Sequence, residues 1–432
     1  MKRIIILVTL LVAGSILVIN FPGCRDTQKS DDKDLSVRER FRDARFGMFV
    51  HWGPVSLKGT EIGWSRGREV PIKEYDSLYK KFNPKKFDAE RWVSLLEDAG
   101  MKYLVIVTKH HDGFAMWDSE TTDYDIMSTP YNEDILEALS RECREQGILF
   151  GTYYSIADWW HPNYPLVQNK EGRKETADMD AYSEYMKAQI KELVRDYQTK
   201  ILWFDGEWEE PWTHEMGQDM YSYVKSLDDE ILINNRVDKG RAGMEGFTKS
   251  DEYAGDFATP EQQVGRFDTT TLWESCITIG TQWAWKPDDD IKSLEECIRL
   301  LVQTAGGDGN LLFNLGPKPD GTIEDRQAER LRDIGNWLDK YGESIYGTRG
   351  GPLKPKEWGV TTHKGNKVYL HILEPENKIQ IKNFPYEVRD ARLLNDGSNV
   401  TYEKTGKMLN IVLSQNRPEA VDYIVELSCK KQ

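Results

Sequence analysis

The sequence predicts an α/β protein built from a (β/α)8-like barrel followed by a C-terminal antiparallel β-sandwich. Three observations predict this architecture. From about Ser36 to Gly347, short apolar segments alternate with amphipathic helical segments. The apolar segments run almost without polar interruption, which is typical of parallel strands that are covered on both faces. After Gly350 the helical periodicity gives way to short strands separated by Asn, Asp, Gly and Pro turns.

Seven apolar segments are the expected barrel strands. They span residues 46–52, 103–111, 149–155, 201–205, 231–236, 272–276 and 309–315. A regular barrel of this kind has eight strands, so we expect an irregular one. An open doubly wound sheet is the alternative. The sequence HWGPVS after the first strand lacks the glycine-rich phosphate fingerprint of that fold.

Amphipathic helices are expected between the strands, at 89–99, 132–146, 179–197, 294–304 and 322–341. The first stops at Gly100, and the second is expected to run from an N-cap at Asn132 to Gly147. The last is expected to begin at a capping Thr322.

Strands of the C-terminal region are expected at 367–374, 378–384, 408–414 and 421–427. They predict a sandwich over 349–432 that packs against a barrel over 36–348. These strands carry no aromatic cluster, which argues against a carbohydrate-binding module.

The N-terminus has the composition of a targeting segment. Lys2 and Arg3 precede an apolar run over 4–19, and Gly23 precedes Cys24. We expect a lipoprotein-type signal over 1–24 and a polar tether over 25–35. The protein would then be exported and held by a lipid on Cys24, in the periplasm or at the outer membrane or cell surface. Simple signal-peptidase cleavage and an uncleaved anchor are the alternatives.

Charge and cysteine content exclude several other partners. The net charge of −15 argues against nucleic acid, and against membrane contact other than through the lipid anchor. The four remaining cysteines are scattered, without a CxxC pair, so we expect neither a zinc site nor a disulfide framework. No feature of the sequence indicates the oligomeric state.

Polar and aromatic residues gather at the ends of the predicted strands. In strand order these residues are His51, His110 and His111, Tyr153 and Tyr154, Trp203 and Asp205, Arg236, and Glu274. The carboxyl ends of barrel strands open on one mouth, so we expect these side chains to share a site. Neighbouring strand residues point to opposite faces, which argues against His110 and His111 as joint metal ligands.

A carboxylate among His, Arg and aromatic side chains suits a sugar, whose hydroxyls bond polar groups and whose apolar face packs on rings. Cleavage of a glycosidic bond needs two carboxyl groups. The motifs FGMFVHWG, TKHHDGF, LFGTYYS, LWFDGEW, WESC and GGDGNLLFNLGPKPDG occur in this order between about residues 40 and 350. Together they resemble the α-L-fucosidases of glycoside hydrolase family 29. The resemblance implies a barrel with a β-sandwich, and retaining exo-hydrolysis of fucosylated glycans through a covalent fucosyl-aspartate. It implies no metal and no organic cofactor.

The resemblance also assigns roles to residues. It implies that Asp205 is the nucleophile. The residues that it places around the fucose are His51, Glu61, Trp64, His110, His111, Tyr153 or Tyr154, Trp203 and Arg236. For the acid/base, the segment GDFATPEQ favours Glu261 over Glu274, which is then a structural or sugar-positioning carboxylate; Glu252 is more remote.

Three interpretations remain open at this point. The first is a fucosidase, and the segments GTEIGWSRGREVP and TPEQ favour α-1,3/1,4-linked fucose as its substrate. The second is a fucose-binding protein without a competent acid. The third is a barrel glycosidase for another sugar, such as a galactoside.

Overall fold

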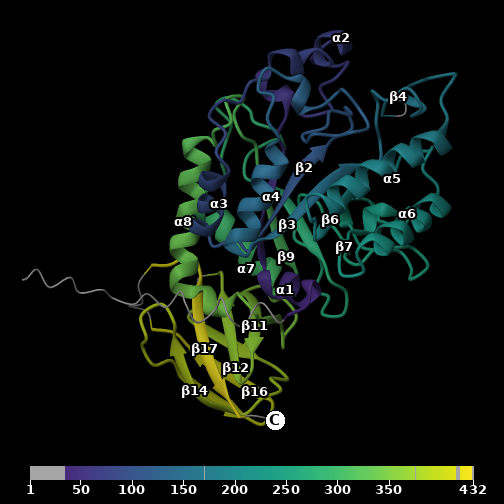
Figure 1. Cartoon of the computed structure of the whole chain (residues 1–432). Coiled ribbons are helices and arrows are strands. Elements are labelled where there is room, and N and C mark those ends of the chain that lie inside the picture. The colour runs from purple at the N-terminus through teal and green to yellow at the C-terminus, as the bar shows by residue number, and fades with distance from the viewer. Residues whose placement is uncertain (1–34, 170, 375, 415–418, 431–432) are drawn as a thin grey trace, which may run out of the picture. The chain divides into compact units, whose positions relative to one another are not determined.

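The computed structural model describes residues 35–169, 171–374, 376–414 and 419–430. A curled sheet of seven parallel strands forms its centre, in the order β7-β6-β3-β2-β1-β9-β8 (Figure 1). The strands are β1 (Phe46–Val50), β2 (Tyr103–Lys109), β3 (Leu149–Ser155), β6 (Ile201–Asp205), β7 (Leu232–Ile233), β8 (Glu274–Thr278) and β9 (Asn310–Leu315). The seven strands lie within the seven apolar segments of the sequence, apart from the last two residues of β8.

The strands are buried on both faces, as their continuous apolar sequences predict. In β1, Phe46, Met48 and Val50 join the core between the sheet and the helices, whereas Phe49 joins the core inside the curled sheet. Alternate residues of one strand therefore serve two separate cores. A polar side chain inside a strand must find a partner in one of them.

An irregular segment, residues 256–262, closes the gap between β7 and β8. Its backbone forms parallel bridges to both edges, pairing Phe257 with Asn234, Ala258 with Trp273, and Glu261 with Cys276. Backbone N–H groups of Asn235 and Cys276 donate to Phe257 and Pro260 at 2.9 and 3.0 Å. This segment takes the place of an eighth strand without regular strand structure, so the barrel is irregular.

Helices cover the outside of the sheet (Figure 1). These covering helices are α3 (Ala89–Asp98), α4 (Ile135–Gln146), α5 (Met179–Arg195), α6 (His214–Leu227), α7 (Leu294–Gly306) and α8 (Asp325–Tyr341). Two other helices, α1 (Val37–Ala44) and α2 (Ile72–Tyr75), contribute Phe41 and Tyr75 to the core inside the curled sheet. Short 3-10 helices are η2 (Pro54–Leu57), η3 (Leu78–Lys81), η4 (Ile126–Ser128), η5 (Asn235–Val237), η6 (Gly243–Glu245) and η7 (Gly342–Ser344). A small hairpin, β4 (Leu166–Gln168) with β5 (Glu171–Arg173), lies between β3 and α5.

Two predicted helix starts are wrong. The N-cap of α4 is Asp134, whose carboxylate accepts from Leu136 and Glu137 N–H, whereas Asn132 lies before the helix with φ of +50°. The N-cap of α8 is Glu324, because Thr322 is held in a turn by Asp320 through its N–H and hydroxyl. At α4 a second capping residue, Asp134, lies two positions after the predicted one, whereas Glu324 precedes α8 without a side-chain cap bond.

The C-terminal region contains two antiparallel sheets with a shared apolar core. One sheet has the order β10-β11-β12-β17-β14 and the other β13-β16-β15. Their strands are β10 (Arg349–Gly350), β11 (Gly359–Lys364), β12 (Lys367–Ile372), β13 (Lys378–Ile381), β14 (Val388–Leu393), β15 (Thr401–Thr405), β16 (Met408–Val412) and β17 (Tyr423–Cys429). Four of these, β10, β11, β14 and β15, are additions to the predicted set.

This region is held to the barrel helices by specific bonds. Arg299 of α7 donates to the Leu373 carbonyl at 2.5 Å, and the Thr362 hydroxyl donates to the Ser344 carbonyl at 2.6 Å. Within the described ranges, no helix is long and apolar enough to cross a bilayer. The predicted signal and tether lie outside the described residues.

Candidate active site

A pocket opens at the carboxyl ends of the barrel strands. It encloses about 380 Å³ of empty space, open solvent at its mouth included. The lining residues are Phe49, His51, Trp64, His110, Tyr153, Trp203, Asp205, Trp208, Arg236, Glu261, Cys276 and Trp283. The many rings, with polar side chains among them, suit a sugar.

Asp205, the last residue of β6, is the buried carboxylate of this pocket. Tyr153 donates its hydroxyl to Oδ2 at 2.9 Å, Arg236 donates Nη1 to Oδ1 at 2.6 Å, and His111 Nε2 lies 3.7 Å from Oδ2. Burial alone raises the pKa of Asp205, but the charges of Arg236 and Arg241 outweigh it and lower the pKa below its ordinary value. The carboxylate is therefore ionised at neutral pH.

The residue after Asp205 must be glycine. Gly206 has φ of +93°, and a Cβ there would lie 2.8 Å from the backbone nitrogen of Ala157. The tight turn directs the Asp205 side chain into the mouth while the chain leaves toward α6.

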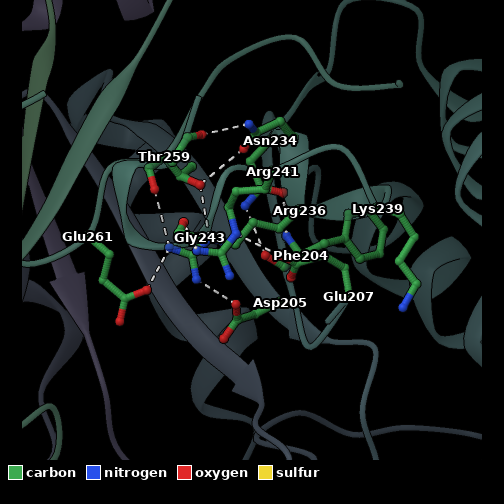
Figure 2. A network of polar contacts seen from close by, with 12 residues as sticks. Phe204, Asp205, Glu207, Asn234, Arg236, Lys239, Arg241, Gly243, Thr259 and Glu261 are labelled. Carbon is green, nitrogen blue, oxygen red and sulfur yellow. Dashed lines mark hydrogen bonds and ion pairs between the residues drawn. The ribbon is translucent and has the colours of Figure 1, made fainter. Parts of the chain in front are cut away.

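Arg236 joins the two candidate catalytic carboxylates (Figure 2). Its Nη1 binds Asp205, and its Nη2 donates to Glu261 Oε2 at 2.9 Å. The guanidinium also donates Nε to Thr259 Oγ1 at 2.9 Å and lies 4.4 Å above the Trp203 ring centre. Burial lowers the pKa of Arg236, but the two carboxylates more than offset this and raise it, so the cation is permanent. The two terminal nitrogens of one rigid guanidinium thus hold the Asp205 and Glu261 carboxylates in place.

Three histidines form part of the polar wall. His51 Nδ1 lies 2.6 Å from Asn314 Oδ1, and His111 Nδ1 lies 2.5 Å from Ser155 Oγ. His110 stacks on Tyr153 with 5.5 Å between ring centres and 7° between planes. Burial lowers the pKa of His51 to about 3 and of His111 to about 4, and brings that of His110 well below its ordinary value. All three are neutral near pH 7, when an imidazole can both donate and accept.

The expectation that His110 and His111 face opposite ways is wrong. Strand β2 ends at Lys109, and the chain turns beyond it, so the two rings lie 4.2 Å apart on the same side. Lys109 is the residue that points outward, where its ammonium pairs with Asp158 at 3.1 Å.

Tyr153 and Tyr154 are separated by the alternation of β3. Tyr153 lines the pocket, but the Tyr154 hydroxyl donates to Gln189 of α5 at 2.7 Å, on the helix side of the sheet. The sequence left either tyrosine open as a sugar contact, and the geometry excludes Tyr154.

Glu274 lies beneath the pocket floor. Its Oε1 accepts from Trp203 Nε1 at 3.0 Å, its Oε2 accepts from the Tyr103 hydroxyl, and it has no exposed surface. Burial raises its pKa to about 7. Trp203 separates Glu274 from the cavity. Glu274 is therefore placed to hold the Trp203 ring in the pocket floor rather than to contact the reacting atoms.

Glu61 and Trp64 come from the loop after β1 and lie differently from one another. Glu61 accepts three backbone N–H bonds, from Trp283 at 2.8 Å and from Ala284 and Ile62 at 3.1 Å, and it holds the loop that brings Trp283 to the pocket. Trp64 lines the pocket itself, nearly parallel to Trp208 with 6.3 Å between ring centres.

Four lining residues were absent from the predicted set, namely Phe49, Trp208, Cys276 and Trp283. Two of them could have been predicted from their positions next to strand ends, because Trp208 lies three residues after Asp205 and Trp283 follows the end of β8. A buried ion pair was also missed: Arg241 donates Nε to Glu207 at 2.6 Å beside Trp208 (Figure 2). In the part of the chain that the structure describes, no three His, Cys, Asp or Glu side chains are arranged to hold a metal ion.

We compared the chain with protein families and with solved structures. Residues 23–343 match the family model described as "Alpha-L-fucosidase". The tissue α-L-fucosidase of Homo sapiens is 30% identical over 374 residues, which cover 78% of this chain and 76% of that one. A solved α-L-fucosidase isoenzyme 1 from Paenibacillus thiaminolyticus superposes with a TM-score of 0.83 at 32% identity, covering 92% of this chain and all of that one.

A second solved structure is chemically informative. It is a GH29 α-L-fucosidase from Bacteroides thetaiotaomicron, trapped as a covalent intermediate with 2-fluoro-fucosyl fluoride. It superposes with a TM-score of 0.82 at 28% identity, over 91% of this chain and 96% of that one. With the family model covering most of its length, this chain belongs to the α-L-fucosidase family, glycoside hydrolase family 29.

Proposed function

We propose that this chain is a retaining exo-α-L-fucosidase that removes terminal α-L-fucose from glycans through a covalent fucosyl-Asp205 intermediate. One observation carries the proposal: Asp205 and Glu261 are held by the two terminal nitrogens of Arg236 in a pocket lined by aromatic rings and histidines. A nucleophile and an acid/base on either side of the anomeric carbon are what retention requires.

In the first step Asp205 attacks the anomeric carbon while Glu261 donates its proton to the departing glycosidic oxygen. The bond from carbon to the leaving oxygen breaks as the bond to Asp205 Oδ forms, and the leaving group departs as a neutral alcohol. The hydroxyl of Tyr153 and the guanidinium of Arg236 hold the carboxylate in place, so little reorganisation accompanies the attack.

In the second step Glu261 removes a proton from water, which attacks the same carbon and releases Asp205. Formation of the ester has by then removed the charge of Asp205, and Arg236 keeps Glu261 as its anionic partner. The neutral imidazoles His51 and His110 line the pocket as hydroxyl partners that can donate or accept.

The nucleophile is tested by substitution and trapping. Asp205→Asn should lose hydrolysis by about three or more orders of magnitude while it keeps wild-type unfolding behaviour. Wild-type protein treated with 2-fluoro-fucosyl fluoride should carry the label on Asp205 in peptide mass spectra. A label on any other side chain would overturn the assignment, as would an active Asp205→Asn enzyme that is free of deamidated product.

The acid/base is tested by chemical rescue. Azide should restore turnover of an activated aryl fucoside by Glu261→Ala, with α-fucosyl azide as product, because azide is an anionic nucleophile that attacks the anomeric carbon and releases Asp205 without help from a base. Glu274→Gln is the matched control and should neither need nor respond to azide. Rescue of the Glu274 variant alone would transfer the role to that residue.

The two other interpretations have their own tests. A non-catalytic fucose-binding protein would need its second carboxyl remote from Asp205, and the shared guanidinium argues against this. Preferential turnover of an aryl galactoside over an aryl fucoside would favour a different sugar.

We further propose that the substrate fucose is α-1,3- or α-1,4-linked, on the sequence of the segments around Glu61 and Glu261. A panel of α-1,2-, α-1,3-, α-1,4- and α-1,6-fucosylated oligosaccharides tests this, and fastest release from the α-1,2 or α-1,6 members would contradict it.

We also propose export and lipid attachment at Cys24. Palmitate labelling of the expressed protein should disappear in Cys24→Ser, and labelling that persists would contradict the anchor.

A further inference from the structure

The catalytic pocket leaves the rest of the substrate outside. The fucose lies among the lining residues, and the rings of Trp64 and Trp208 form part of the wall around it. During protonation the leaving oxygen must lie within about 3 Å of the Glu261 carboxyl group. The saccharide attached to that oxygen therefore extends out of the pocket past Glu261.

A tight turn, residues 241–248, flanks Glu261 on that side. The Glu261 N–H donates to the Met244 carbonyl at 3.0 Å, and the Gln263 side chain donates to the same carbonyl at 2.8 Å. The Thr259 N–H donates to the Gly246 carbonyl at 3.1 Å. The acid-bearing segment and the turn are thus bonded backbone to backbone, and the turn's tip lies directly beside the acid.

The base of the turn is rigid. Arg241 and Thr248 form an antiparallel bridge, and Arg241 Nη1 donates to the Gly243 carbonyl at 2.7 Å (Figure 2). Gly246 has φ of +77°, and a Cβ there would lie 2.1 Å from the backbone of Pro260. The tip is therefore presented by a fixed scaffold, which reduces the entropy cost of using it for binding.

Met244 at this tip is exposed to an unusual degree. It is 48% exposed. In the described residues only four large apolar side chains are exposed, and the other three are Leu57, Ile72 and Val412. A thioether side chain adapts to irregular apolar surfaces, such as the C–H face of a pyranose. The side chains of Gln262 and Gln263 are exposed on the chain next to Glu261, and their amides match sugar hydroxyls.

We infer that Met244, at the tip of the 241–248 turn, binds the sugar on the leaving side of the cleaved bond and so selects the glycan that is hydrolysed. The inference rests on the proposed function, because Glu261 must be the acid that marks the leaving side. Met244 then has a role in specificity and none in the chemical step.

The test compares a saccharide substrate with one that has no saccharide leaving group. The probes are α-L-fucosyl fluoride and whichever fucosylated trisaccharide of the linkage panel the wild type cleaves fastest. Met244→Ser should lower kcat/KM for the trisaccharide by about 5- to 20-fold, because the apolar contact is lost, and leave fucosyl fluoride within about twofold. Met244→Leu, which keeps the apolar area, should restore most of the trisaccharide activity.

Val412→Ser is the matched control, since Val412 is 44% exposed on β16 of the C-terminal sheets, and it should change neither substrate. Equal losses on both substrates would overturn the inference, because they indicate a structural effect on Glu261. An unchanged trisaccharide rate would overturn it too. If Met244→Ser passes the test but trapping labels a residue other than Asp205, the nucleophile assignment fails while the binding surface stands.

Discussion

The buried carboxyl of Glu274 makes the stability of the protein depend on pH in a predictable direction. Its pKa is raised from 4.5 to about 7 by burial under Trp203. The folded state therefore binds the proton more tightly than the unfolded state does. The stabilisation is complete below about pH 4.5 and is lost as the pH rises through 7. A difference of this size corresponds to about 3 kcal/mol of unfolding free energy.

Glu274→Gln removes the titrating group and keeps a side chain of the same shape. The gain in unfolding free energy of the variant over wild type should be about 3 kcal/mol larger at pH 8 than at pH 4.5. Denaturant unfolding at several pH values measures this difference. Glu210→Gln is the control, because the Glu210 side chain is 72% exposed and should give no pH-dependent gain.

Two results would refute the reasoning. Parallel pH profiles for wild type and Glu274→Gln would show that the buried carboxyl does not titrate as its surroundings require. A loss of activity by more than about two orders of magnitude would show that Glu274 does more than support Trp203. A modest change in kcat, with KM altered by a shifted floor, is the expected kinetic result.

Three further substitutions test the assignment of faces and pairs. Tyr153→Phe should lower kcat/KM by about tenfold or more, since Asp205 loses a hydrogen bond, and steady-state kinetics on an aryl fucoside measures it. Tyr154→Phe should leave the kinetics unchanged and cost about 1 kcal/mol in denaturant unfolding, because its hydroxyl bonds a helix; a raised KM would contradict this placement. Lys109→Met should destabilise the fold by about 3–5 kcal/mol by leaving Asp158 buried without its cation, and an unchanged unfolding midpoint would contradict that reading.

Much of the site follows from one regularity of the sequence. Apolar strands that end in polar or aromatic residues must deliver those ends to the same mouth, whatever the details of the helices. This reasoning brought His51, Tyr153, Asp205 and Arg236 together before any coordinates, and the structure places all four in one pocket.

What failed depended on contacts across long stretches of chain. Glu61 holds the loop of Trp283, more than 200 residues later, through backbone N–H bonds that no local pattern announces. The inward face of β3 depends on its pairing with neighbouring strands, which sequence alone left undecided between Tyr153 and Tyr154. His110 and His111 lie on the same side only because β2 ends at Lys109, two residues before the end of the predicted segment.

The alternation of strands predicts Glu261 as the acid/base less directly than it predicts Asp205 as the nucleophile, and the fold gives the reason. Asp205 ends a regular strand, so its position is fixed by the pairing of β6 with β3 at five positions and with β7 at two. Glu261 lies on the irregular segment 256–262, which closes the barrel through scattered bridges and carries no repeating pattern of its own. A carboxylate on such a segment is positioned by tertiary bonds, here Arg236 and the Met244 carbonyl, rather than by strand periodicity. The same freedom lets the segment and its flanking turn change together, so we expect the proposed acid and the proposed surface for the leaving sugar to vary as one unit.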